Sequence, residues 1–463
     1  MVKKGIVLVM VALWVLGGSS WAMKWDFHGS LINSVWSTDN WKVMENAADS
    51  RKTDWFVANV GGQKYYGRKS STALDDLSIL EKFSGDDSAF VGYTKGRLRF
   101  EGSTDDGLAK FVYGLEVGGY IWGEGRGFGY SGDGINTETR FLYGEIRFLG
   151  GLLRAGLQPV KINHWVWMET AAGLSYHYKT DLYGLMLGWY RGDVGEGKFD
   201  MDSNDELLVV KGNYRVDPDL TLGGFVIYHD QGKEELGAVA DYNNHSYYLG
   251  FTGKAKFAPF FFAWDVIYQG GELEFEGNAA EDMDRSAWLL HLKAGYKVSD
   301  NFRVWARFLY VSGDDDADET DPRAIDRDLD NFESIDVDVK VGMIFFKEEG
   351  LRGGDKNYLD APYIGPHGLI NYALYGEYQI NPRHKLKMAV MYHQTDVDLI
   401  DEDGSKDNDL GWEFDLWYNY KYNKNVTCKV EAAYLIAGDG LDALAEGNAD
   451  EMYFVGAGIL FKF

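Results

Sequence analysis

Apolar and polar residues alternate along almost the whole chain of 463 residues. In FRVWARFLYV (302–311), apolar residues from Phe302 to Tyr310 occupy one set of alternate positions, and Arg303 and Arg307 lie on the other. Residues 285–297 and 409–422 show the same pattern. A period of two is that of a β-strand with one apolar and one wet face. The pattern therefore predicts an all-β fold.

The alternating segments are longer than strands of soluble proteins usually are. They run for about ten to fourteen residues, which is enough to cross a bilayer at a tilt. Eighteen are predicted, at 24–36, 94–103, 109–122, 137–149, 152–159, 172–179, 181–191, 206–216, 220–229, 245–256, 259–270, 285–298, 302–312, 368–380, 384–394, 409–422, 426–437 and 451–463.

Short and long connections alternate between these segments. Short turns are predicted at 103–107, 150–151, 179–181, 216–219, 258–259, 298–301, 380–383 and 422–425, with longer polar loops between them. This asymmetry is typical of outer-membrane barrels. We therefore predict one transmembrane antiparallel β-barrel over residues 23–463, with about 18 strands and a range of 16 to 20. Residues 334–346 also alternate, and form either a hairpin strand inside an external loop or half of an extra pair.

The first 22 residues have the organisation of a cleaved signal peptide. Lys3 and Lys4 precede an apolar stretch, and Ser20 and Ala22 provide small residues for cleavage. Removing the two lysines changes the net charge from -26 to -28. This acidity argues against nucleic acid as a partner. With the barrel prediction, the segment indicates export to the bacterial outer membrane, where lipid and lipopolysaccharide are the expected neighbours.

A row of charged side chains is expected on the lumen wall of the early strands. Its members are Lys95, Arg97, Arg99, Glu101, Lys110, Glu116, Glu145, Arg147, Arg154 and Gln158, and Arg303 and Arg307 are further lumen candidates. Such a basic ladder would orient anionic or hydroxylated solutes near a constriction. The alternative is that Arg and Glu pair across strands only to satisfy one another.

Two long insertions carry most of the remaining sequence. Residues 37–92 either fold into the lumen and narrow it or form an external cap, and about 313–366 form an acidic external loop. Asp314, Asp316 and Asp318 could bind calcium, but the run lacks the spacing and glycine of an EF-hand loop. A solvated loop is favoured, and no metal or other cofactor is expected.

The chain ends on an alternating strand, MYFVGAGILFKF (452–463). A closed barrel has no free edge, so this strand must pair with the first one. Tyr453, Phe461 and Phe463 lie in the predicted lipid-facing row, and the aromatic terminus resembles the signal that the barrel-assembly machinery recognises.

These features together resemble the Gram-negative outer-membrane porins, and within them the alginate-export type. The closer likeness rests on RAGLQP (154–159), SGDDD (312–316) and GLINYALYGEYQINPRHKL (368–386). The resemblance implies passive passage of small solutes, with inward arginines favouring anions, and homo-oligomers are possible. An alternative is a sheath or scaffold for a partner protein, for example an electron-transfer conduit. Ser175 and His177 share a strand face, but no acidic orienter or G-x-S-x-G motif supports an enzyme.

Overall fold

The structure is a computed structural model. It describes residues 23–38, 53–60, 63–70, 89–122, 137–192, 205–236, 240–275, 282–318, 328–337, 341–345, 351, 362–400, 404–444 and 451–463. The predicted signal peptide (1–22), most of the 37–92 insertion and much of the acidic loop lie outside these residues.

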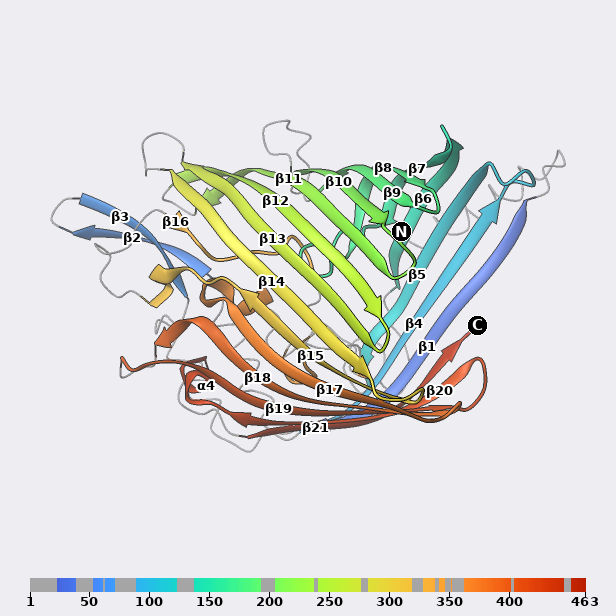
Figure 1. Ribbon diagram of the computed structural model, residues 1–463. Coiled ribbons are helices and arrows are strands. Elements are labelled where there is room, and N and C mark those ends of the chain that lie inside the picture. The colour runs from blue at the N-terminus through green and yellow to red at the C-terminus, as the bar shows by residue number, and fades with distance from the viewer. Residues whose placement is uncertain are drawn as a thin grey trace.

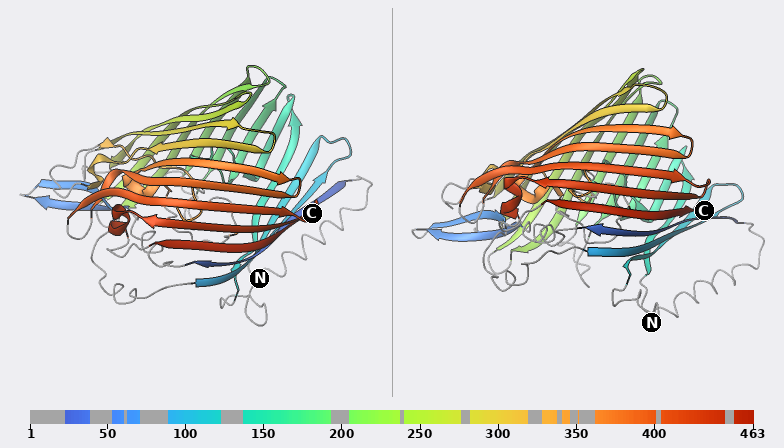
Figure 2. Two further views of the ribbon diagram at one scale, coloured as in Figure 1. Left: turned by 60° about the horizontal axis from the view of Figure 1, so that its bottom comes forward. Right: turned by 90° about the horizontal axis from the view of Figure 1, so that it is seen from below.

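Eighteen long strands among the described residues form one closed antiparallel barrel. Figures 1 and 2 show the strands running side by side around the barrel. The strands are β1 (Lys24–Thr38), β4 (Ala89–Ser103), β5 (Ala109–Ile121), β6 (Thr137–Phe148), β7 (Gly151–Pro159), β8 (Thr170–Lys179), β9 (Tyr183–Arg191), β10 (Glu206–Arg215), β11 (Leu220–Leu236), β12 (Ala240–Phe257), β13 (Phe260–Phe275), β14 (Met283–Lys297), β15 (Phe302–Val311), β17 (Leu369–Asn381), β18 (His384–Ile400), β19 (Lys406–Lys421), β20 (Val426–Ala437) and β21 (Met452–Lys462). Each pairs with its neighbours in this order. The predicted all-β barrel and its strand number are confirmed.

The barrel closes between the first and last strands. β1 pairs along one edge with β4 and along the other with β21, from Ser30↔Lys462 to Thr38↔Phe454. Gly29 and Phe463 exchange two backbone hydrogen bonds of 2.8 and 3.0 Å just beyond that ladder. Every strand in the ring therefore has a partner on both sides, which satisfies the backbone groups that lipid cannot.

Apolar side chains cover the outside of the barrel. On β14, Trp288, Leu292 and Tyr296 are 48%, 44% and 41% exposed, whereas Ala287 and Leu289 on the other face are fully buried. Similar exposed apolar residues recur on strands around the ring. An apolar surface of this extent is stable next to lipid rather than water. Among the described residues, no helix has the length and apolar character to span a membrane.

Eight short turns join consecutive strands at one end of the barrel. They lie at 104–108, 149–150, 180–182, 216–219, 258–259, 298–301, 382–383 and 422–425, each within two residues of its prediction. Local hydrogen bonds define them: at 216–219, Asp217 Oδ1 accepts the N–H groups of Asp219 and Leu220, both at 2.7 Å. The long connections lie at the opposite end.

Several small elements lie outside the strand ring. They are the hairpin β2 (Thr53–Val60) and β3 (Gln63–Ser70), the two-residue β16 (Asp328–Leu329) beside β14, η4 (Asp315–Asp318), η5 (Pro362–His367) and α4 (Asp439–Leu444). In Figures 1 and 2 the β2–β3 hairpin projects away from the barrel at the long-loop end. This described part of the 37–92 insertion therefore does not enter the lumen.

The alternating segment 334–346 adds no strand pair in its described parts, 334–337 and 341–345. Asp336 makes an isolated bridge with Trp167, and the N–H groups of residues 343–345 bond to a barrel carboxylate. These described parts lie inside the barrel and pack on its inner face. Of the two predicted alternatives, an extra pair that would make twenty strands is wrong for the described residues.

Candidate functional site in the barrel lumen

The early strands carry a ladder of charged side chains on their inner face. We call it the basic ladder; it comprises Lys95, Arg97 and Arg99 on β4, Lys110 on β5, Arg140 on β6 and Arg154 on β7, with the carboxylates Glu101, Glu116 and Glu145. Antiparallel neighbours bring these positions side by side. The ladder as named comprises six cations and three carboxylates.

Glu116 is the centre of the ladder. Its carboxylate contacts Lys95, Arg97 and Arg140, with Arg97 Nε at 2.7 Å and Arg140 Nε at 3.3 Å. Its side chain is 8% exposed, whereas that of Arg97 is 48% exposed, so the carboxylate lies behind the guanidinium groups. A solute in the lumen therefore meets the cations first.

Glu101 and Glu145 hold the ladder toward the short-turn end. Glu101 accepts from Arg99 Nε at 2.6 Å and from Lys110 Nζ at 2.9 Å. Glu145 accepts from Arg154 Nε at 2.6 Å. The cross-strand pairing considered in the sequence analysis is therefore present, and the pairs leave an excess of cations.

Two predicted lining residues have other roles in the structure. Arg147 Nε donates to the carbonyl of Gly107 at 3.1 Å, at the short-turn rim. Gln158 is fully buried, donates to the carbonyl of Gly173 and accepts from Ser175 Oγ at 2.6 Å. Ser175 Oγ lies 2.9 Å from Nε2 of His177, but Ser175 is only 1% exposed. A solute cannot reach that hydroxyl.

A second group of cations lies on the inner face of β14, β15, β17 and β18. We call it the aromatic-backed wall; it comprises Lys293, Arg303, Arg307, Lys385 and Lys387 with Glu377, over the rings of Trp305, Tyr375 and Trp417. Its one named carboxylate, Glu377, pairs with Arg303 and Lys385. Arg303 and Arg307 are the members of this wall that the alternation of the sequence predicted. Their aromatic support is visible only in the fold.

The rings fix the positions of these cations. Trp305 and Tyr375 stack at 5.0 Å with an interplanar angle of 7°. Lys387 Nζ lies 3.9 Å from the ring centre of Trp417, and Lys293 Nζ lies 4.8 Å from that of Trp305. Such cation–π contacts hold an ammonium group over the face of the ring.

Residues 160–169, between β7 and β8, turn into the lumen and reach the opposite wall. Asn163 Nδ2 donates to Asp265 Oδ1 at 2.8 Å, and His291 Nδ1 lies 2.9 Å from Oδ2 of the same carboxylate. Lys211 donates to two carbonyls of the loop, each at 2.7 Å. The loop is thus bound to β10, β13 and β14, and it narrows the lumen.

The tip of this loop is formed by His164 and Trp165. Trp165 is 2% exposed, and its carbonyl accepts from the hydroxyl of Tyr363 in η5 at 2.5 Å. Desolvation by the surrounding protein lowers the pKa of His164 to about 4. This imidazole is therefore uncharged at pH 7.

A second inward segment crosses the later strands. We call residues 341–345 and 351 the lumen strap. Arg307 donates to the carbonyl of Val341 at 2.6 Å, and Glu413 accepts three N–H groups of residues 343–345. Leu351 is held at both of its backbone groups: its N–H donates to Glu431 Oε2 at 2.7 Å, and its carbonyl accepts from Ser34 Oγ at 2.8 Å. The strap therefore lies along the inner wall from β15 to β1.

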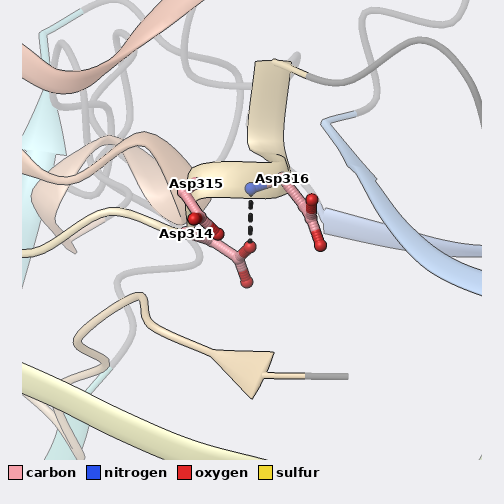
Figure 3. Close-up of side chains that lie close together, drawn as sticks. All are labelled: Asp314, Asp315 and Asp316. Carbon is pink, nitrogen blue, oxygen red and sulfur yellow. Dashed lines mark hydrogen bonds between the residues drawn. The ribbon is translucent and has the colours of Figure 1, made fainter. Parts of the chain in front are cut away.

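Three aspartates cluster where β15 enters η4, as Figure 3 shows. Carboxylate oxygens of Asp314, Asp315 and Asp316 lie within 4.8 Å of one another, and Asp314 Oδ1 accepts the N–H of Asp316 at 3.2 Å. The side chain of Asp318, the third predicted calcium ligand, lies outside the described residues. The predicted preference for a solvated loop at this position stays a prediction.

Comparisons with known proteins place this geometry among known folds. No protein-family model matches the chain, and no curated protein matches it. Among solved structures, Pseudomonas aeruginosa OccK8 (OprE) is 14% identical, with a TM-score of 0.51 over 96% of this chain and 99% of its own. Acinetobacter baumannii OccAB4 is 10% identical, with a TM-score of 0.51 over 96% and 100%.

The outer membrane protein OprD from Pseudomonas aeruginosa is 11% identical, with a TM-score of 0.50 over 96% of this chain and 95% of its own. At these identities the likeness concerns the fold. The chain therefore has the barrel fold of the Gram-negative outer-membrane porins, and the apolar outer face of that barrel places it in the bacterial outer membrane.

Proposed function

We propose that the barrel is a channel through which small hydrophilic solutes or ions diffuse passively across the outer membrane, with a preference for anions. The observation that carries the proposal is the pair of basic walls. The basic ladder spans β4 to β7 and the aromatic-backed wall spans β14 to β18, nearly half the circumference away. A solute between them faces positive charge on both sides.

The environment of these charges strengthens their effect on a passing ion. Arg97 and Arg303 have side chains 48% and 49% exposed, so their guanidinium groups reach the water of the lumen. Charges of one sign in a cleft with low-dielectric walls concentrate counter-ions. Rings of Arg and Lys select anions in pores by the same means. The net charge of -26 over the whole chain does not oppose this, because selectivity depends on the charges nearest the narrow passage.

Barrel size and filling favour passage of small molecules over enclosure of a protein partner. Barrels of about eighteen strands are wide enough for an aqueous channel. The β7–β8 loop and the lumen strap occupy part of that width, and Trp165, Phe345 and Tyr363 are buried among them. A partner protein would have to displace this packing, so we disfavour the sheath alternative.

We propose lipopolysaccharide and the barrel-assembly machinery as partners. The closer likeness to the alginate-export type, a homo-oligomeric state and the absence of enzymatic activity remain predictions.

Single-channel recording in planar bilayers tests the function. The wild-type barrel is expected to conduct, with a reversal potential in a salt gradient that indicates anion preference. In Arg97→Gln/Arg99→Gln the reversal potential should shift toward the value of a non-selective channel, because two of the ladder's cations are removed. Arg147→Gln is the matched control, since Arg147 bonds to a turn carbonyl at the rim and should leave selectivity unchanged.

Two results would contradict the proposal. A barrel that inserts without conducting would exclude free passage and favour a sheath or scaffold. An unaltered reversal potential in the double variant would reduce the basic ladder to a structural role.

A further inference from the structure

Glu413 is a fully buried carboxylate on the inner face of β19, and its main partners are backbone N–H groups of the lumen strap. Oε1 accepts from Met343 at 2.7 Å and from Ile344 at 2.6 Å, and Oε2 accepts from Phe345 at 3.0 Å. Asp415 Oδ2 provides Met343 with a second acceptor at 3.0 Å. Three successive N–H groups that converge on one carboxylate form a strong, charge-assisted contact.

The strap and the wall are also complementary in shape. A Cβ at Gly342 would meet the carboxylate of Glu413, and a Cβ at Gly458 of β21 would meet the side chain of Leu351. The absence of side chains at these two glycines therefore lets the strap approach the wall closely. Val341, Phe345 and Leu351 are each fully buried in that position.

The partners of Glu413 are unusual for a lumen carboxylate. Glu101, Glu116 and Glu145 bond to Lys and Arg side chains, whereas Glu413 has the strap backbone and Nε2 of His393 at 3.3 Å. Burying a carboxylate is costly unless hydrogen bonds compensate. For Glu413 the compensating hydrogen bonds come from the strap backbone, so the bonds that stabilise the buried carboxylate also hold the strap on the wall.

We infer that Glu413 is a positioning residue of the channel: its carboxylate holds the lumen strap against the wall and keeps the strap out of the passage. The inference rests on the proposed channel function. Without the carboxylate, the N–H groups of Ile344 and Phe345 lose their acceptor and that of Met343 keeps only Asp415, so the strap is held less firmly on β19. Released residues then enter the remaining lumen and interrupt the current.

Hydrogen exchange of the purified barrel, measured by mass spectrometry, tests the contact directly. In Glu413→Ala, the amides of Met343, Ile344 and Phe345 should exchange faster by roughly tenfold or more, because bonds to a charged acceptor are lost. Peptides from the barrel strands should be unchanged. Unchanged protection of the strap amides would overturn the inference.

Glu377→Gln is the matched control. It removes the same charge from a lumen carboxylate that bonds to Arg303 and Lys385 and does not contact the described strap. Strap exchange in this variant should equal that of the wild type. Equal acceleration in Glu377→Gln and Glu413→Ala would attribute the effect to lumen charge and overturn the assignment to Glu413.

Chemical rescue separates positioning from general destabilisation. Formate added to Glu413→Ala should restore protection of the three amides, because a small carboxylate fits the vacated position, and chloride at equal concentration should not. If formate has no effect, the three N–H groups do not form a carboxylate site and the inference fails.

A second variant covers the case in which Glu413→Ala does not assemble. Gly342→Ala alters the strap and leaves the wall intact, and it should accelerate the same amides. A folded Gly342→Ala barrel with wild-type protection would overturn the inference.

Single-channel records connect the contact to passage. Glu413→Ala should show frequent brief closures that the wild type lacks. A conducting barrel with faster strap exchange and no added closures would overturn the role in the passage. A sealed wild-type barrel would instead overturn the channel proposal and leave the exchange result standing.

Discussion

At the level of single residues, Glu116 shows how local irregularity shapes the lumen. Arg140 reaches this carboxylate although the pairing of β5 with β6 shifts there, from Gly114↔Phe141 to Leu115↔Thr139. Strict alternation counted back from Glu145 and Arg147 would turn Arg140 outward. A β-bulge inserts one residue and reverses the faces beyond it. Sequence parity therefore found Glu116 and missed Arg140.

The terminal residue provides a prediction at this scale. The Phe463 ring lies 5.6 Å from that of Phe27 and over Gly29, to which the backbone of Phe463 also bonds. Deleting Phe463 removes these contacts at the closing seam and the aromatic terminus. We expect a several-fold loss of folded barrel in the outer membrane, measured as heat-modifiable, protease-resistant protein.

Phe463→Tyr is the control for that deletion, because it keeps the ring and the backbone and should assemble normally. Wild-type amounts of folded barrel after the deletion would remove Phe463 from the assembly signal.

At the level of elements, the 149–150 turn shows why a hairpin needs particular residues. Leu149 and Gly150 have φ of 47° and 77°, the pattern of a two-residue hairpin turn with both φ values positive. Gly150 adopts this conformation without the steric cost that a Cβ imposes. The sequence analysis placed a turn at 150–151, within one residue.

Gly150→Val should therefore destabilise the hairpin of β6 and β7. The expected loss is about 1–2 kcal/mol in the free energy of unfolding, since left-handed backbone is costly for residues with a Cβ. Urea unfolding of the barrel in lipid vesicles measures it. Gly144→Ala on β6 is the control, because Gly144 lacks positive φ and its Cβ would meet nothing within 4 Å. Equal stability of the two variants would show that turn strain is absent.

Residues 334–346 show the limit of pattern reading for an element. Their alternation matches that of a barrel strand, yet the described N–H groups of 343–345 bond to Glu413. A barrel strand and an inward-folded loop both bury one face of the segment and satisfy its backbone. The segment can become a barrel strand only if a neighbouring strand has a free edge, and in a closed ring no strand has one. The alternation of short and long connections requires an even number of strands, so a single nineteenth strand would not fit.

At the level of the whole molecule, charge is divided by location. The chain carries a net charge of -26, while the named side chains of the basic ladder and of the aromatic-backed wall include more cations than carboxylates. Because screening confines each charge to its surroundings, net charge predicts little about the lumen. Function depends on where the folded chain places each group.

The pairing of β1 with β21, which closes the ring, can be tested by cross-linking. Val35 faces Ala457 across β1 and β21, and directly opposed residues have Cα atoms about 4.5–5.5 Å apart. A disulfide accepts Cα separations of about 4.4–6.8 Å. In a Cys428→Ser background, which removes the single native cysteine, Val35→Cys/Ala457→Cys should oxidise readily and shift mobility on denaturing gels.

Val35→Cys/Val455→Cys is displaced by two residues along β21, where Cα atoms are about 7–8 Å apart, and should cross-link poorly. Preferential cross-linking of the displaced pair would refute the register, and none in either pair would refute closure between β1 and β21.

The sequence by itself determined the barrel: strand period, strand length and the alternation of short turns with long loops are local properties set by the pleat and the bilayer thickness. It also placed Arg97, Arg99 and Glu116 on one wall, because alternation carries through regular strands. Only the tertiary structure decided that Arg147 bonds to a turn, that a bulge turns Arg140 inward, and that residues 343–345 lie on the inner wall at Glu413. These outcomes depend on contacts between residues far apart in the chain, which no local pattern encodes.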